Sequence, residues 1–245
     1  MTISGWNLRY LEILKEFKYD KNQDLESAII LDSILKESDS LKQIQKTISS
    51  NTVFVIGAGP SLSSAIPFLK KYKKTTKIVA DSALKELVEN KIVPDIVATD
   101  LDGDEKTMIK IGKTKTMFVV HAHGDNMARL HLAENFKNCI GTTQTKPFGK
   151  IHNFGGFTDG DRAVFLANHF EAKNIVLFGM DFGNKIGKFS HTKDSDRKIK
   201  LKKLRKAKSL LQWLAKKSRS ELFTTSNPID GFKKIDYQEL DIIIT

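Results

Sequence analysis

The chain has 245 residues, of which 40% are hydrophobic and 28% charged, and its 40 Lys and Arg against 29 Asp and Glu give a net charge of +11. These values are ordinary for a globular protein with a sizeable core and leave room for an anionic partner. The single cysteine, Cys139, excludes an internal disulfide and a cysteine-based zinc site. We find no apolar run that could cross a bilayer and no signal-peptide pattern, so we expect a cytoplasmic protein with no membrane partner.

The first 50 residues have a helical pattern. Apolar residues recur at helical spacing from Trp6 to Phe17 and from Asp24 to Leu35, and a third helix is expected from Leu41 to Ile48. No chemistry is evident in this stretch. We therefore divide the chain into a helical segment at 1–50, a core at 51–190 and a C-terminal segment at 191–245 that packs on the core.

A glycine turn follows the first predicted strand, Val53–Ile56. It contains Gly57, Gly59 and Ser61 and leads into another helical pattern. Glycines there let the backbone approach a ligand, and the helix N-terminus offers amide groups to phosphate. The turn indicates nucleotide binding, or alternatively a tight turn without ligand, because the Gly-x-Gly-x-x-Gly fingerprint is incomplete.

Two more predicted strands end in acidic residues. Ile78-Val79 leads to Asp81, and Ile96–Ala98 leads to Asp100 and Asp102. Side chains at i and i+2 of a strand face the same way, so this pair would present two carboxylates side by side if strand geometry continues that far. Such a pair favours a hard divalent cation, whereas the alternative is a surface turn, in which Asp and Gly are common.

The same pattern recurs along the chain. Apolar runs ending at Val120, Ile140 and Phe178 are each followed by polar residues and glycines, and helical patterns separate many of the runs. This alternation predicts an α/β fold with a mostly parallel sheet and helices on both faces. Ligands bind such sheets outside the carboxyl ends of the strands, where these polar clusters would meet.

His121 and His123 repeat the i, i+2 spacing, and Asp125 lies two residues further on. Two imidazoles and a carboxylate could bind a transition metal or donate hydrogen bonds to phosphate, and one histidine could be purely structural.

Asp159 and Asp161 lie at the predicted start of a helix, after Thr158. They could cap that helix, where acidic residues are favourable, or supply a third carboxylate to the metal centre.

The stretch 185–219 holds much of the excess positive charge. Leu204, Ala207, Leu211 and Leu214 recur within it at helical spacing, which predicts an amphipathic helix with a basic outer face. That face is either solvated or binds an anion. A nucleic-acid partner is disfavoured because the chain has no aromatic-rich nucleic-acid motif.

Six motifs in order resemble the archaeal 6-hydroxymethyl-7,8-dihydropterin pyrophosphokinase family, whose core is similar to thiamine pyrophosphokinase. They cover most of residues 50–190 and are Gly57–Leu62, Ala80–Leu84, Pro94-Asp95 with Thr99–Gly103, His121–Asn126, Phe157–Ala163 and Gly179–Gly183. Thiamine pyrophosphokinases bind magnesium through Gly-Asp-x-Asp-Ser. The carboxylates match Asp100 and Asp102 here, but the flanking residues are Thr99 and Gly103.

The resemblance implies transfer of a pyrophosphoryl group from ATP to the hydroxymethyl group of 6-hydroxymethyl-7,8-dihydropterin, in folate or tetrahydromethanopterin-type biosynthesis. It implies magnesium on Asp100 and Asp102, with Asp159 or Asp161 completing the metal shell.

Further roles follow from the same resemblance. The turn at Gly57 and Gly59 would cradle the nucleotide, His121 or His123 would stabilise the transferring group, and a basic residue from 185–205 would close over the triphosphate. Asp125 could accept the hydroxyl proton. Asn153 or Asp181 could hold the pterin edge.

Other functions are also compatible with these motifs. Thiamine is an alternative acceptor. A dinucleotide-binding oxidoreductase would use the glycine turn with Asp81 at the end of the next strand, an RNA-binding protein would use the basic helix, and a sugar-nucleotide enzyme could also use an Asp-x-Asp metal site. The sequence leaves open whether the chain forms homo-oligomers.

Overall fold

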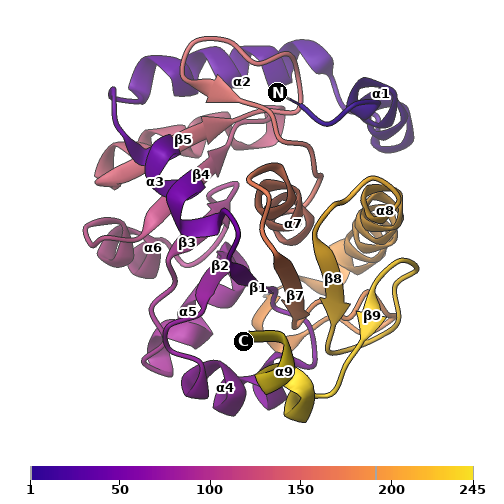
Figure 1. The fold of residues 1–245 in the computed structure, drawn as a ribbon. Helices are drawn as coiled ribbons and strands as arrows, with labels where there is room; N and C mark the ends of the chain where they lie inside the picture. The colour runs from indigo at the N-terminus through magenta and orange to yellow at the C-terminus, as the bar shows by residue number, and fades with distance from the viewer. Residues whose placement is uncertain (1, 191, 245) are drawn as a thin grey trace.

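A single parallel sheet forms the centre of the molecule (Figure 1). The computed structural model describes residues 2–190 and 192–244, and within them nine strands pair in the order β6-β5-β4-β3-β2-β1-β7-β8-β9, every neighbouring pair parallel. The strands are β1 (Thr52–Ile56), β2 (Thr76–Ala80), β3 (Ile96–Thr99), β4 (Met117–His121), β5 (Asn138–Thr142), β6 (Ile151–His152), β7 (Asn174–Phe178), β8 (Glu221–Thr224) and β9 (Lys233–Lys234). The predicted α/β class and parallel sheet are confirmed.

Helices cover both faces of the sheet. One layer contains α1 (Trp6–Phe17), α3 (Ser40–Ile48), α7 (Asp159–His169) and α8 (Arg197–Ala215). The other contains α2 (Lys21–Ile34), α4 (Leu62–Lys71), α5 (Asp81–Glu89), α6 (Glu105–Gly112), α9 (Leu240–Ile244) and the 3-10 segment η1 (Gly124–Asn135). Short 3-10 turns occur at η2 (Lys188–Ser190), η3 (Asp194–Asp196) and η4 (Tyr237–Glu239). None of the helices in the described part of the chain is both long and apolar enough to cross a membrane.

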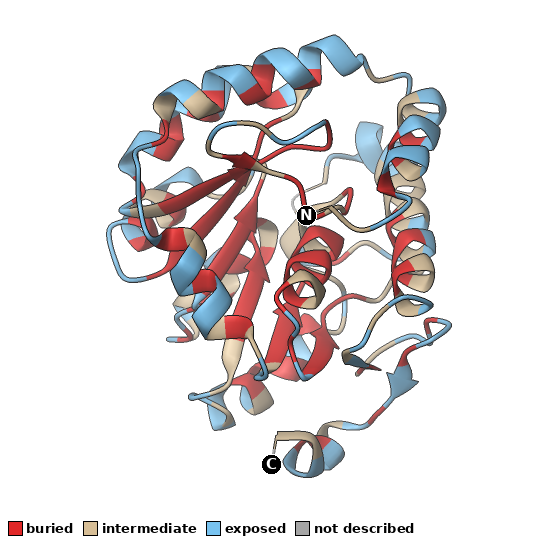
Figure 2. Cartoon of the chain, turned by 45° about the horizontal axis from the view of Figure 1, so that its top comes forward, coloured by how far each residue is buried: buried red, intermediate tan, exposed pale blue. Residues whose placement is uncertain are grey.

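The strands are apolar on both sides because both faces are covered. In β1, Val53 and Val55 join the core beneath α1, α7 and α8, whereas Phe54 and Ile56 join the core beneath α4 and α5. Figure 2 shows the strands buried along most of their length and the exposed residues concentrated on the outer sides of the helices. Continuous apolar runs are therefore the expected signature of this sheet.

The helical patterns of the sequence are also confirmed. Trp6, Tyr10 and Ile13 form the buried stripe of α1 and pack into the same core as α7. In α8 the buried residues are Ala207, Leu210, Leu211 and Leu214. The predicted basic outer face is only partly present, because Lys202 and Lys206 pair with acidic residues of α1. The short strands β6, β8 and β9 were not expected, because two to four residues give no periodic signal.

The two sides of α1 give a direct test of its packing. Ile13 is fully buried, whereas Leu8, on the same helix, is 67% exposed. Ile13→Ala should lower the free energy of unfolding by about 2–5 kcal/mol because it leaves a cavity in the main core, and Leu8→Ala should change it by less than about 0.5 kcal/mol. Urea denaturation of both variants measures this. Equal, small effects would show that α1 is not part of the cooperative core.

Candidate active site

A cavity of about 760 Å³ opens at the carboxyl ends of β1, β2, β3 and β7. The chain runs outward from β1 to β6 on one side and from β7 to β9 on the other, so the order reverses between β1 and β7. Doubly wound sheets bind their ligands at such a point. The cavity lies where the sequence predicted that the polar clusters would meet.

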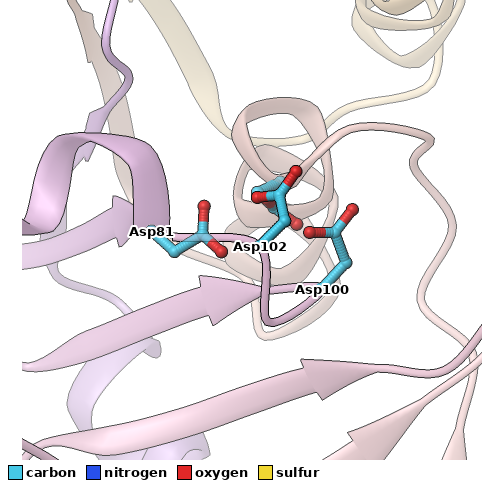
Figure 3. Close-up of side chains that lie close together, drawn as sticks. Asp81, Asp100 and Asp102 are labelled. Atoms are coloured by element: carbon cyan, nitrogen blue, oxygen red, sulfur yellow. The ribbon is translucent and has the colours of Figure 1, made fainter. Parts of the chain in front are cut away.

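Four aspartates form an acidic cluster in this cavity: Asp81, Asp100, Asp102 and Asp159. Each offers one carboxylate oxygen, and these four oxygens lie within 4.8 Å of one another. Asp81 opens α5 directly after β2, two of the others follow β3, and Asp159 opens α7. Figure 3 shows Asp81, Asp100 and Asp102 directed toward one another.

The pairing of Asp100 and Asp102 does not arise from strand geometry. β3 ends at Thr99, and Leu101 has a left-handed backbone with φ of 71°. The Leu101 N–H donates to Thr99 Oγ1 at 2.7 Å, and its carbonyl accepts from Arg129 at 3.1 Å. The strand therefore does not continue to these two aspartates, as their predicted side-by-side arrangement required. A turn held by these two hydrogen bonds brings the carboxylates together instead.

Gly103 allows this turn to approach α5 closely. A Cβ at this position would lie 3.1 Å from Cβ and Cγ of Asp81. Thr99 joins the same contact, because its hydroxyl donates to Asp81 Oδ2 at 2.7 Å.

Burial and mutual repulsion set the protonation of the cluster. Burial, followed by the charges of Asp102 and Asp100, raises the pKa of Asp81 to about 8. Burial and Asp100 raise the pKa of Asp102 to about 6, and burial with Asp100 and Asp81 raises the pKa of Asp159 well above its usual value. Burial also acts to raise the pKa of Asp100, but the hydrogen bond from His123 and the charge of Arg162 outweigh it and hold that pKa low.

The cluster fits a hard divalent cation. All four donors are carboxylate oxygens, which magnesium prefers over nitrogen or sulfur ligands. Oδ1 of Asp81 and Oδ1 of Asp100 are buried and have no hydrogen-bond partner among the described residues. Buried carboxylate oxygens without donors are costly unless a positive charge meets them.

Of the two histidines, His123 contacts the cluster. Its Nε2 lies 3.5 Å from Asp100 Oδ2, and its Nδ1 accepts from the Asp125 N–H at 3.2 Å, which places the proton of the neutral ring on Nε2. His121 is buried beside Thr142, and burial with nearby Arg162 and His123 lowers its pKa well below the usual value. The Asp125 side chain is 62% exposed, and none of these three residues lines the cavity.

Asp159 and Asp161 have different roles at the start of α7. Asp161 is fully buried and accepts hydrogen bonds from the N–H groups of Phe157 and Thr158 at 2.8 and 2.7 Å, so it caps the helix. Only Asp159 reaches the acidic cluster, where Arg162 donates to it at 3.0 Å.

The glycine turn lines the cavity, but its amides are largely occupied. The N–H groups of Gly57 and Gly59 donate to the carbonyls of Phe178 and Gly179 at 2.9 and 2.7 Å. The Ser61 N–H and hydroxyl donate to the Asp181 carboxylate at 3.1 and 3.0 Å. The glycines are needed for close backbone contact, because a Cβ on Gly59 would overlap Asp181. Asn153 lies elsewhere, with its amide donating to the carbonyls of Gln144 and Thr145.

Six cations line the cavity around the acidic cluster. They are Lys85, Arg129, Lys185, Lys193, Lys200 and Lys203. Lys200 makes no hydrogen bond or close ion pair with the residues that the structure describes, and its charge acts on Asp102. Lys206 instead pairs with Glu12 and Glu16 of α1 and anchors the basic helix.

Comparison with known proteins identifies the family. Residues 29–187 match the model of the 6-hydroxymethylpterin diphosphokinase MptE-like family. The chain belongs to this family. Proteins named 6-hydroxymethyl-7,8-dihydropterin pyrophosphokinase from Methanocaldococcus jannaschii and Pyrococcus furiosus are 39% and 43% identical to it, and each alignment covers 90% of the chain and 99% and 97% of the relative.

A solved structure supports the fold alone. The Maf glycosyltransferase of Magnetospirillum magneticum AMB-1 superimposes with a TM-score of 0.58 at 13% identity, over 81% of this diphosphokinase-family chain and 38% of the glycosyltransferase. The structural neighbour is thus a glycosyltransferase, whereas the sequence suggested a core like that of thiamine pyrophosphokinase.

Several site residues of this diphosphokinase-family chain were missed in the sequence. Thr99 and Arg129 tie the Asp100–Asp102 turn, Arg162 pairs with Asp159, and Asn126 donates to the Asp100 carbonyl. Thr99, Asn126 and Arg162 lie inside the motifs named above, so the resemblance was the signal that could have identified them. Arg129 lies outside those motifs.

The raised pKa values predict how stability depends on pH in metal-free protein. The folded Asp81 binds a proton up to about pH 8, whereas an unfolded aspartate loses it near pH 4, so the folded state holds more protons in between. The free energy of unfolding should therefore fall as pH rises from about 4 to 8. Asp81→Asn, which keeps an acceptor for Thr99, should flatten this slope and stabilise the protein at pH 8 by up to about 5 kcal/mol.

Urea denaturation in EDTA at pH 5 and pH 8 measures the effect. Asp39→Asn is the control, because Asp39 is 71% exposed and remote from the cluster. An Asp81→Asn protein that loses stability at pH 8 would contradict the assignment.

Proposed function

We propose that this chain transfers a diphosphate group from ATP to the hydroxymethyl group of 6-hydroxymethyl-7,8-dihydropterin and releases AMP, with magnesium held by the acidic cluster. Its family membership and its similarity, over 90% of the chain, to two archaeal pyrophosphokinases support the reaction. The pterin diphosphate would serve folate or methanopterin-type biosynthesis.

The observation that carries the proposal is the acidic cluster in the cavity at the strand ends. A family member that handles a nucleoside triphosphate must neutralise several phosphate charges. Asp100, Asp102, Asp81 and Asp159 would hold magnesium, since their oxygens converge and two are buried without donors. When bound, magnesium would offset charge on the phosphate oxygens and help to hold them in place.

The chain's own cations would position the triphosphate. Lys200 and Arg129 line the cavity and their charges act on Asp102, so they would meet the phosphate oxygens held at the cluster. Lys203 also lines the cavity, and its ammonium lies 5.7 Å from the Tyr19 ring. This assignment gives the basic helix a specific anion-binding role on its inner side.

The chemical step requires orientation rather than covalent catalysis. The pterin hydroxyl oxygen would attack the β-phosphorus of ATP in line with the bond from that phosphorus to the α-phosphate oxygen. That bond breaks, AMP leaves and the hydroxyl proton passes to water. Gly57, Gly59 and Asp181 would form the wall of the cavity on the side of β1 and β7. Phe157 and Ile199 would offer apolar contacts to a planar ring.

His123 would act on the reaction indirectly, through its contact with Asp100. Its Nε2–H faces the Asp100 carboxylate, so it holds that group ionised. His121 and Asp125 lie outside the cavity lining, and none of their contacts with the described residues supports a direct role for them. Thiamine is the second candidate acceptor, based on the Asp-x-Asp turn that resembles thiamine pyrophosphokinase.

Removal of a carboxylate tests the metal assignment. Asp100→Asn and Asp102→Asn should each reduce AMP formation by at least about 100-fold, because the cluster loses charge where the phosphates bind. Formation of AMP from ATP and the reduced pterin with magnesium measures this, and Asp39→Asn serves as the control for loss of one remote charge. Near-normal turnover in both cluster variants would refute the assignment.

The identity of the acceptor is tested by product mass. Purified protein with magnesium and ATP, given the reduced pterin and thiamine together, should form the pterin diphosphate. Formation of thiamine diphosphate alone would support the alternative.

Lys200 tests the role of the basic helix. Lys200→Ala should raise the KM for ATP by about 10-fold or more, because a hydrogen bond to a charged group contributes roughly 1.5–3 kcal/mol. Lys198→Ala is the matched control, since Lys198 lies on the same helix, is exposed and is not part of the cavity lining. Steady-state kinetics at fixed ionic strength compares the two. An equal KM change in both variants would indicate only a general effect of net charge.

A further inference from the structure

Asn126 lies at the centre of a hydrogen-bond network behind the acidic cluster. Its side chain is 5% exposed, and Nδ2 donates to the carbonyls of Asp100 and His121, both at 2.7 Å. Oδ1 accepts from the His123 N–H at 3.1 Å and from the Ser27 hydroxyl at 3.4 Å. Both amide hydrogens and the amide oxygen are therefore used.

These partners allow only one orientation of the amide. A flipped side chain would place Oδ1 against two carbonyl oxygens and Nδ2 against an N–H donor. Reversal would leave the Asp100 and His121 carbonyls and the His123 N–H without these partners, and a buried group left without a partner costs about 1–3 kcal/mol.

The network forms a closed ring that includes Asp100 twice. Asn126 holds the Asp100 carbonyl with one end of its amide and the His123 backbone with the other. The His123 ring in turn points Nε2 at the Asp100 carboxylate, 3.5 Å away. The Asn126 amide therefore fixes the backbone of Asp100 directly and its carboxylate through His123.

We propose that Asn126 is a positioning residue that holds Asp100 and His123 in the arrangement in which the acidic cluster binds a divalent cation. The proposal rests on the proposed function of the cluster as a metal site. Partners that orient metal ligands typically contribute 10- to 100-fold to metal affinity. Asn126 touches neither the cavity nor the cluster carboxylates, so it acts only through the two residues that it holds.

Helix capping is the competing explanation. Asn126 closes a capping box at the start of η1, in which its oxygen accepts from His123. A cap needs only the acceptor, which a carboxylate supplies equally well. The two donated bonds go outside η1, to the ends of β3 and β4. Asn126→Asp therefore keeps the cap and removes both donors.

Manganese binding separates the two explanations. Wild-type protein, Asn126→Asp, Asn126→Ala and the control Ser27→Ala would be titrated with Mn²⁺ and followed by electron paramagnetic resonance of the free ion. We expect 10- to 100-fold weaker binding in both Asn126 variants and less than about 2-fold change in Ser27→Ala, which loses only the 3.4 Å contact. The added negative charge of Asn126→Asp would by itself strengthen Mn²⁺ binding, so weaker binding by this variant would reflect the loss of the two donated hydrogen bonds. Far-UV circular dichroism and thermal melts in EDTA identify folded protein.

Each outcome decides a different point. Wild-type Mn²⁺ affinity in both folded Asn126 variants would overturn the inference while leaving the metal site intact. No Mn²⁺ binding by the wild-type protein would instead reject the proposed metal site. Failure of both variants to fold would also overturn the inference, since Asn126 would then be a determinant of the fold.

Discussion

Four carboxylates held within 4.8 Å of one another are the constraint on which the rest of this structure depends. Burial and mutual repulsion raise the pKa values of Asp81, Asp102 and Asp159. Only the pKa of Asp100 is lowered, by the hydrogen bond from His123 and the charge of Arg162. Oδ1 of Asp81 and Oδ1 of Asp100 are buried there without a hydrogen-bond donor among the described residues. A cluster of this kind destabilises the fold unless cations bind, which is a typical feature of a functional site.

The parallel sheet makes such a cluster possible. It brings the ends of β2 and β3 and the start of α7 to one edge, although Asp81 and Asp159 are far apart in sequence. The N-terminal helices, which show no chemistry of their own, brace this edge. Asp24 of α2 accepts from the Tyr10 hydroxyl at 2.7 Å and from the Gly124 N–H at 3.0 Å, next to His123. Stability of the core and precision of the site are therefore linked through buried polar contacts.

Much of the fold could be predicted because strands buried on both faces leave continuous apolar runs. The meeting of Asp81 with the turn after β3 could be predicted from the carboxyl ends of neighbouring parallel strands, but the left-handed turn at Leu101 that pairs Asp100 with Asp102 could not be predicted. The choice between Asp159 and Asp161 did not, because both lie in the first turn of α7 and only the phase of the helix decides which one caps it. The sequence could not show that the amides of the glycine turn are taken by Phe178 and Gly179, since those contacts join segments more than 100 residues apart. The roles of Arg129 and Asn126 depend on similar contacts with the Asp100 turn.

The most direct measurement is a crystal structure with Mn²⁺ and an ATP analogue that has a methylene bridge between the α- and β-phosphates. We expect anomalous density within about 2.2 Å of carboxylate oxygens of Asp100 and Asp102, with the β-phosphate on the same ion and Lys200 beside the triphosphate. Manganese bound elsewhere, or nucleotide bound in the cavity with these two carboxylates directed away from it, would contradict the account.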